Sequence, residues 1–216
     1  MNTLSPCALD HLVVTAPTLE SGTDWVQREL GVTLQQGGEH PTMGTHNRLL
    51  RLGETTYLEV IAVNPAAPKP ERPRWFGLDG LSPASPRLAA WVARTPDIET
   101  TFTACAKPLG AILPMHRGEL RWRISVPDDG VPTLGGIVPA LIEWATQPHP
   151  AAKLPDSGCT LLRLEGFHPD KTNARTVLES IRADGLLELH PLPASDKPRL
   201  VAHVLTPGGT RVLGDR

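Results

Sequence analysis

The hydrophobic pattern of this chain occurs three times: a short apolar run, then a proline, a polar capping residue and apolar residues at helical spacing. The three copies read VVTAPTLESGTDWV, WVARTPDIETTF and LEGFHPDKTNARTV, with prolines at Pro17, Pro96 and Pro169. These prolines are 79 and 73 residues apart (17 to 96 and 96 to 169). A repeat of this length predicts one duplicated unit that contains a strand, a helix and further strands.

Each unit is predicted in the same way, from apolar strand runs, helix caps and glycine stops. In the first unit, the helix begins after Thr18 and ends at Gly31, and the strands lie at 9–15, 34–39, 45–52 and 55–63. The loop at Gly53 and Glu54 is typical of a short β-hairpin.

The second and third units follow the first. The second has a helix after Asp97 whose apolar stripe extends to Leu109, and strands at 88–93, around Ile112, at 120–126 and at 138–144. The third has a helix between Asp170 and Gly185, and strands at 160–164, 187–192, 200–205 and 210–213. We therefore expect an α+β fold of tandem βαβββ modules at 1–66, 86–147 and 158–216, with a proline-rich connector or lid at 67–85.

Composition narrows the classes of partner. The 216 residues carry a formal net charge of −2, and this predicts no nucleic-acid or membrane partner. Apolar runs are too short to span a bilayer. The three cysteines are odd in number and far apart in the sequence, which favours free thiols in a reducing cytoplasm.

Three polar residues lie within otherwise apolar strands. His11 follows Asp10 in the first strand, and a buried imidazole needs partners for its nitrogens, so a hydrogen-bonded core histidine is the alternative interpretation. Glu59 and Glu143 occupy the last strand of the first and second units, 42 and 47 residues after the repeat proline. A solvent-facing carboxylate is the alternative for each, but two glutamates in matching strands favour a functional interpretation.

The segment HPTMGTHN adds two further candidates, His46 and Asn47. If Gly53 and Glu54 form a two-residue loop, His46 shares a face of the sheet with Glu59; a loop one residue longer places Asn47 there instead. In the connector, Trp75 and Phe76 are expected to dock onto the fold.

Arg121 and Arg123 alternate along a strand of the second unit. They could present a cation to an anionic substrate group, or they could lie on a solvated face of the sheet.

Together, DHLV, HPTMGTHN, YLEVIA, RWFGL and the tandem βαβββ repeat resemble the vicinal-oxygen-chelate superfamily, in particular its glyoxalase-like branch. The resemblance implies that paired modules curl into a cup, a curved and partly open mixed sheet with helices outside. It also implies a divalent metal (Fe, Mn, Zn or Ni) held by His11, Glu59 and Glu143, and a small-molecule substrate with adjacent oxygens.

On this resemblance, we expect a lyase, isomerase or dioxygenase. Glu59, Glu143 and His46 are its candidate catalytic residues, and the candidate substrate-binding residues are Asn47, Trp75, Phe76, Arg121 and Arg123. The chain departs from the superfamily pattern at Ala90, which occupies the repeat position of His11. A metal-free protein that binds a small molecule with its aromatic side chains is therefore the alternative. The third module either covers a sheet edge or completes a sheet with another copy, and this favours a homodimer.

Overall fold

A computed structural model describes residues 4–80 and 85–214. The first unit consists of β1 (Ala8–Thr15), α1 (Leu19–Leu30), β2 (Gln35–His40), β3 (Thr45–Arg51) and β4 (Tyr57–Val63). The second consists of β5 (Arg87–Arg94), α2 (Ile98–Ala104), β6 (Ala111–Arg117), β7 (Leu120–Val126) and β8 (Ala140–Trp144). The third consists of β9 (Thr160–His168), α4 (Lys171–Ser180), β10 (Glu188–Pro191), β11 (Arg199–Thr206) and β12 (Gly209–Leu213).

Short helical segments connect these elements. They are η1 (Pro41–Met43), η2 (Trp75–Gly80), η3 (Thr133–Gly136), α3 (Pro150–Lys153) and η4 (Asp184–Leu186). Within the described residues, no helix has the length and apolar character needed to cross a membrane.

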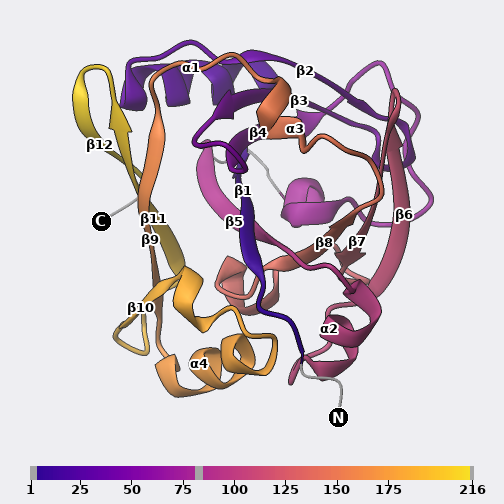
Figure 1. The fold of residues 1–216 in the computed structure, drawn as a ribbon, viewed down its shortest axis with the longest axis vertical. Coiled ribbons are helices and arrows are strands. Elements are labelled where there is room, and N and C mark those ends of the chain that lie inside the picture. Colours follow the sequence, from indigo (N-terminus) through magenta and orange to yellow (C-terminus); the bar gives the residue numbers. More distant parts are fainter. Residues whose placement is uncertain (1–3, 81–84, 215–216) are drawn as a thin grey trace.

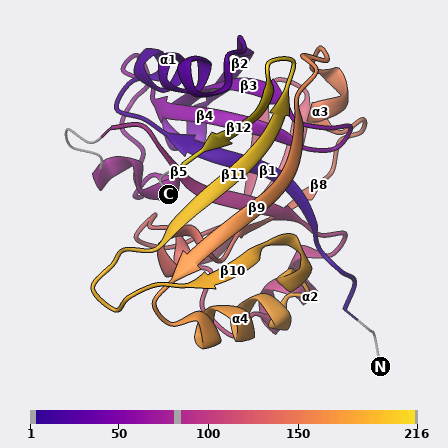
Figure 2. The ribbon, with the colours of Figure 1, turned by 90° about the vertical axis from the view of Figure 1, so that its left-hand side faces the viewer.

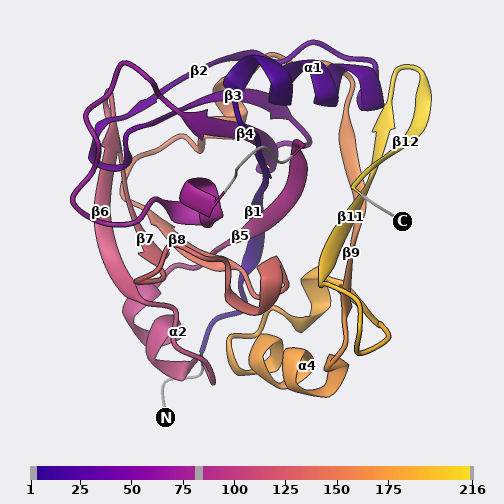
Figure 3. The same cartoon turned by 180° about the vertical axis from the view of Figure 1, so that it is seen from behind.

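The first two units share one eight-stranded sheet, in the order β2-β3-β4-β1-β5-β8-β7-β6. β1 and β5 pair antiparallel at its centre, and each pairs in parallel with the last strand of its own unit. The sheet curls until its edge strands β2 and β6 meet, with η2 inside the curl and α1 and α2 outside (Figures 1 and 3). A Cβ at Gly38 would lie 2.7 Å from Cδ of Arg117, so glycine allows these edges to close. The predicted α+β cup is confirmed.

Local chemistry explains most helix boundaries. The hydroxyl of Thr18 accepts a hydrogen bond from the backbone N–H of Ser21 at the start of α1, and Gly31 ends that helix with a left-handed φ of 70°. The helix predicted to extend to Leu109 is wrong in its length, because α2 ends at Ala104. Pro108 would remove a helical hydrogen bond and disfavours helical backbone at the residue before it.

The third unit has the same order of elements but a different pairing of strands. Its own sheet has the order β10-β9-β11-β12, so β9 lies between β10 and β11. This sheet packs across the outer face of β1 and β5, as Figure 2 shows. The third unit therefore covers a face of the first sheet, whereas the sequence predicts that it covers an edge or pairs with another copy.

The alternation of side chains divides the interior into two cores. Outward-facing residues of the large sheet, such as Leu12 and Val60, pack against α1 and the second sheet. Inward-facing residues, such as Val13 and Ile61, pack with Trp75 of the connector. Polar side chains on the inward face therefore have only the interior of the cup to point into.

Candidate functional site

The register of β3 and β4 decides which polar side chain meets Glu59. Arg51 pairs with Tyr57, so residues 52–56 form a five-residue loop, and Leu49 lies opposite Glu59. An odd loop length places Asn47 on the same face as Glu59, and Nδ2 of Asn47 donates a hydrogen bond to Oε1 of Glu59 over 2.5 Å. His46 points to the other side of the strand, toward α1, and so is not brought to Glu59. The prediction of His46 as a catalytic residue is corrected on this ground.

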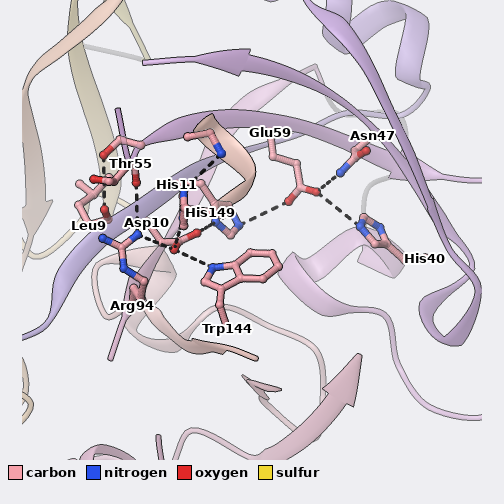
Figure 4. A network of polar contacts seen from close by, with 12 residues as sticks. Leu9, Asp10, His11, His40, Asn47, Thr55, Glu59, Arg94, Trp144 and His149 are labelled. Carbon is pink, nitrogen blue, oxygen red and sulfur yellow. Dashed lines mark hydrogen bonds and ion pairs between the residues drawn. The ribbon is translucent and has the colours of Figure 1, made fainter. Parts of the chain in front are cut away.

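Asp10 is fully buried and fixes the orientation of His11 (Figure 4). Oδ1 of Asp10 lies 2.7 Å from Nδ1 of His11, while Oδ2 accepts hydrogen bonds from Trp144, His149 and Arg94. Burial alone would raise the pKa of Asp10, but hydrogen bonds from His11 and His149 lower it well below its ordinary value. Asp10 is therefore a carboxylate that holds a proton on Nδ1 of His11 and leaves Nε2 facing the cup.

Two imidazoles flank the carboxylate of Glu59 (Figure 4). Nε2 of His11 lies 3.7 Å from Oε2 of Glu59, and Nε2 of His40 lies 3.9 Å from Oε1. Nδ1 of His40 lies 3.1 Å from the hydroxyl of Thr45, and burial lowers the pKa of His40 to about 4. The sequence analysis missed His40, although it is the first residue of the HPTMGTHN segment.

These groups line a pocket inside the cup. Tyr57 stacks on His11 with 4.5 Å between ring centroids, and burial raises its pKa well above the ordinary value, so it remains a neutral phenol. Trp75 and Phe76 cover one side of the pocket, and Phe76 has a left-handed φ of 58° that is unusual for a bulky side chain. The other walls are formed by Arg117, Trp122, Ile124, Ile142 and Trp144.

Arg117, at the end of β6, is a second residue that the sequence analysis missed. Arg117 lies on the same inward face of the strand as Met115. Its positive charge acts to lower the pKa values of His40 and Tyr57. Within the described part of the chain, its guanidinium has no hydrogen bond or ion pair. The pocket is therefore lined by a guanidinium that makes no ion pair among the described residues and by the carboxylate of Glu59.

Glu143 lies on the opposite face of the sheet. It is adjacent in β8 to the pocket residues Ile142 and Trp144, and its carboxylate accepts hydrogen bonds from Arg123 at 3.0 Å and from the backbone N–H of Ile98 at 2.8 Å. The predicted grouping of Glu143 with His11 and Glu59 is therefore wrong.

The register of the sheet explains this error. Val13 pairs with Glu59, and its repeat counterpart Val92 pairs with Ala140, so Ala140 is the counterpart of Glu59 and Glu143 is three residues beyond it. Neither predicted arginine reaches the pocket. Arg123 binds Glu143 and Glu99, and Arg121 binds backbone carbonyls of its own hairpin.

The second unit thus has alanine at the two repeat positions where the first unit has its polar pocket residues. Ala90 replaces His11, and Ala140 replaces Glu59. Both alanines line a separate pocket, which shares Trp75 and Phe76 with the polar pocket. The cup therefore has a polar compartment in its first half and a mainly apolar one in its second.

The donors around Glu59 suit a divalent transition metal in type, since imidazole nitrogen and carboxylate oxygen are its usual ligands. Nε2 of His11 and Oε2 of Glu59 face one another at 3.7 Å, an arrangement that a cation or a proton between them stabilises. Within the described residues, however, the ligand atoms of His11, His40 and Glu59 do not all lie within 4.8 Å of one another. The three side chains would have to rearrange to share one ion, because each imidazole lies beside a different oxygen of Glu59.

Comparisons with known proteins agree with this architecture. The model of the family described as glyoxalase-like domain matches residues 9–181. The crystal structure of a hypothetical protein from Staphylococcus aureus aligns with a TM-score of 0.58 and 13% identity, over 82% of this chain and 75% of that one. No curated protein matches.

Methylmalonyl-CoA epimerases align less well. The Mycobacterium tuberculosis enzyme has a TM-score of 0.44 and 16% identity, over 70% of this chain and 97% of that one. The Streptomyces coelicolor enzyme has a TM-score of 0.43 and 16% identity, over 67% of this chain and 100% of that one. The match to the family model over residues 9–181 confirms the resemblance seen in the sequence: this chain belongs to the family of glyoxalase-like domains, in the vicinal-oxygen-chelate superfamily.

Proposed function

We propose that this protein is an enzyme that moves a proton at a carbon next to a carbonyl group of a small molecule, with Glu59 as the base. The observation that carries this proposal is the buried carboxylate of Glu59 in a pocket, with Asn47 hydrogen-bonded to Oε1 and the imidazole of His11 3.7 Å from Oε2. A positioned carboxylate in such a site abstracts a proton from a bound substrate. Isomerisation or elimination at the carbon next to a carbonyl group begins with this step.

The neighbours of Glu59 have separate roles in the proposal. Asn47 holds one carboxylate oxygen and so aims the other into the pocket. Nε2 of His11 accepts a proton, or a hydrogen bond from a hydroxyl group of the substrate, because Asp10 keeps the other proton on Nδ1. Tyr57, a neutral phenol, is a hydrogen-bond donor for the negative charge that develops on a carbonyl oxygen.

We infer that the substrate carries an anionic group, which binds Arg117. A guanidinium without an ion-pair partner forms its strongest hydrogen bonds with a carboxylate or phosphate group, and the substrate could supply one. Arg117→Gln is expected to raise KM for anionic substrates about tenfold or more. Arg121→Gln, which changes an arginine outside the pocket, is the matched control and is expected to leave KM unchanged.

We propose His11, His40 and Glu59 as the residues that would hold a divalent metal, in place of the set with Glu143. Such an ion would polarise a carbonyl oxygen of the substrate. Metal analysis of protein purified without chelator tests this assignment. His11→Ala is expected to lower the metal content, and an unchanged content would contradict it.

Exchange of substrate protons with solvent tests the proposed base without knowledge of the final product. A panel of 2-oxo acids, 2-hydroxy ketones and acyl thioesters is incubated with the protein in D₂O, and loss of the proton signal next to the carbonyl is followed by NMR. The wild type is expected to exchange at least one member, and Glu59→Gln to slow that exchange about 10²–10⁴-fold. No exchange with any member, or equal exchange by the variant, would contradict the proposal.

A second function, metal-free binding of an aromatic molecule, is favoured by the pocket walls. Trp75, Phe76, Trp122 and Trp144 all line the polar pocket, whereas Trp91 lies in the outer core and donates to a backbone carbonyl. Tight binding of an aromatic ligand without exchange or turnover would support this function over the enzyme.

We also propose a cytoplasmic location and a homodimer. The three free cysteines favour a cytoplasmic location. A homodimer is tested by sedimentation equilibrium of the whole chain, and a monomer at micromolar concentration would contradict it.

A further inference from the structure

We propose that the outer face of the second sheet carries a binding site for Zn²⁺ or a similar divalent ion, formed by Glu165, Glu188 and His190. These residues lie on neighbouring strands, with Glu165 of β9 paired with Glu188 of β10 and His190 two residues further along the same face. One ligand atom from each lies within 4.8 Å of the other two. The site is on a different sheet from Glu59 and is independent of the proposed function.

The distance between two of the ligand atoms is the geometric argument. Nε2 of His190 lies 3.3 Å from Oε1 of Glu165, yet it is shielded from solvent and makes no hydrogen bond within the described residues. Two ligands about 2.0–2.1 Å from a tetrahedral zinc ion lie about 3.3 Å apart. The pair thus has the spacing of two ligands of one ion, and a cation bound between the two atoms would replace the direct ion pair of His190 with Glu165.

Neighbouring side chains hold these ligands in place. His203 of β11 hydrogen-bonds to Oε2 of Glu165, which leaves Oε1 directed toward His190. Phe167 stacks on the ring of His190 with 4.9 Å between centroids. Such outer contacts orient the ligands in metal sites of proteins.

The charge and donor types select the ion. Two carboxylates attract a dication, and two arginines on the same face offset part of that attraction: Arg163, 3.8 Å from Glu165, and Arg199, which stacks on Phe167. One imidazole with two carboxylates suits a borderline ion such as Zn²⁺ better than Ca²⁺ or Mg²⁺, which prefer oxygen ligands alone. Three protein ligands leave one position for water.

Calorimetric titration of the chelator-treated whole protein with Zn²⁺ tests the site. We expect one equivalent that binds at least tenfold more weakly in His190→Ala and in Glu165→Gln. His203→Ala is expected to weaken this equivalent about 10–100-fold through loss of orientation. His116→Ala, at an exposed histidine of β6, is the matched control and retains it, as does Glu59→Gln.

Circular dichroism of each variant establishes that it is folded. Visible absorption of bound Co²⁺ gives a second measurement, because a tetrahedral site with an imidazole ligand produces a distinct spectrum. The proposal is overturned if the wild type binds no Zn²⁺, if His190→Ala and Glu165→Gln bind it as well as the wild type does, or if binding is lost only in Glu59→Gln.

Discussion

His40 shows how a single buried side chain links the pocket to stability. Its ring lies edge-on to Trp75, with 5.1 Å between centroids, and its Nδ1 contacts the hydroxyl of Thr45. Burial is the largest effect on its pKa, and the attraction of Glu59 does not compensate for it. His40 is therefore neutral at pH 7 and remains so in the folded protein well below that pH.

The pKa of His40 predicts a loss of stability in mild acid. Above pH 6.5, the imidazole is neutral in both the folded and the unfolded chain. As the pH falls from 6.5 toward 4, only the unfolded chain takes up the proton, so the free energy of unfolding decreases. Between pH 7 and pH 5, the wild type is expected to lose about 2 kcal/mol more than His40→Gln.

Urea unfolding of both proteins in the presence of chelator measures this difference. Other titrating groups contribute equally to the two proteins and cancel. Equal losses in the wild type and in His40→Gln would show that folding does not lower the pKa of the imidazole.

At the scale of residues, the sequence identified His11 and Glu59 as inward-facing polar groups, and the structure brings them together. It did not identify the partner of Glu59, because Asn47 and His46 are distinguished only by whether the loop has an odd or an even number of residues. His40 and Arg117 were missed because they meet the pocket only when the edge strands close on one another.

At the scale of elements, Glu143 connects three elements on the outside of the cup. Its carboxylate binds Arg123 of β7 and the first backbone N–H of α2, while Asp97 caps the same helix through Thr100. A carboxylate is favourable at this end of a helix because the N–H groups there carry partial positive charge. The role of Glu143 is thus structural in this account.

Glu143→Ala is accordingly expected to lower the free energy of unfolding by about 1 kcal/mol, a modest value because the ion pair with Arg123 is partly exposed to solvent. Denaturant unfolding at pH 7 measures the change. Asp97→Ala is expected to change the free energy of unfolding in the same direction, because Asp97 caps the same helix. No change in either variant would contradict this description of the start of α2.

Most strands could be predicted because their apolar runs are bounded by glycine or proline. The predicted arrangement was wrong where the pairing of strands in the folded protein does not follow from their order in the sequence. In the third unit, the βαβββ order is present, but β9 pairs with β10 and β11 and not with the last strand. The sequence pattern defines each strand but does not state its neighbours.

At the scale of the whole molecule, the third unit covers apolar surface that the cup itself leaves exposed. Leu164, Leu200 and Val204 of the second sheet are buried in the same core as Leu12 and Leu58 of the cup. Removal of this sheet would expose that core to water, and a contiguous apolar surface of this kind drives aggregation. The unit is therefore expected to be required for folding.

A chain truncated after residue 157 tests this expectation. We predict that it is insoluble or lacks cooperative thermal unfolding, whereas the whole chain unfolds in one transition. A soluble, cooperatively folding fragment would show that the cup is an independent domain.

The two halves of the cup also differ in chemistry, since the first supplies Glu59 and His11 where the second supplies Ala140 and Ala90. We therefore expect a single base, the carboxylate of Glu59 in the first half. Solvent exchange of substrate protons by Glu59→Gln and Glu143→Gln, measured side by side, tests this expectation. We predict that Glu59→Gln slows exchange about 10²–10⁴-fold while Glu143→Gln keeps the wild-type rate; equal loss in both variants, or loss only in Glu143→Gln, would contradict the account.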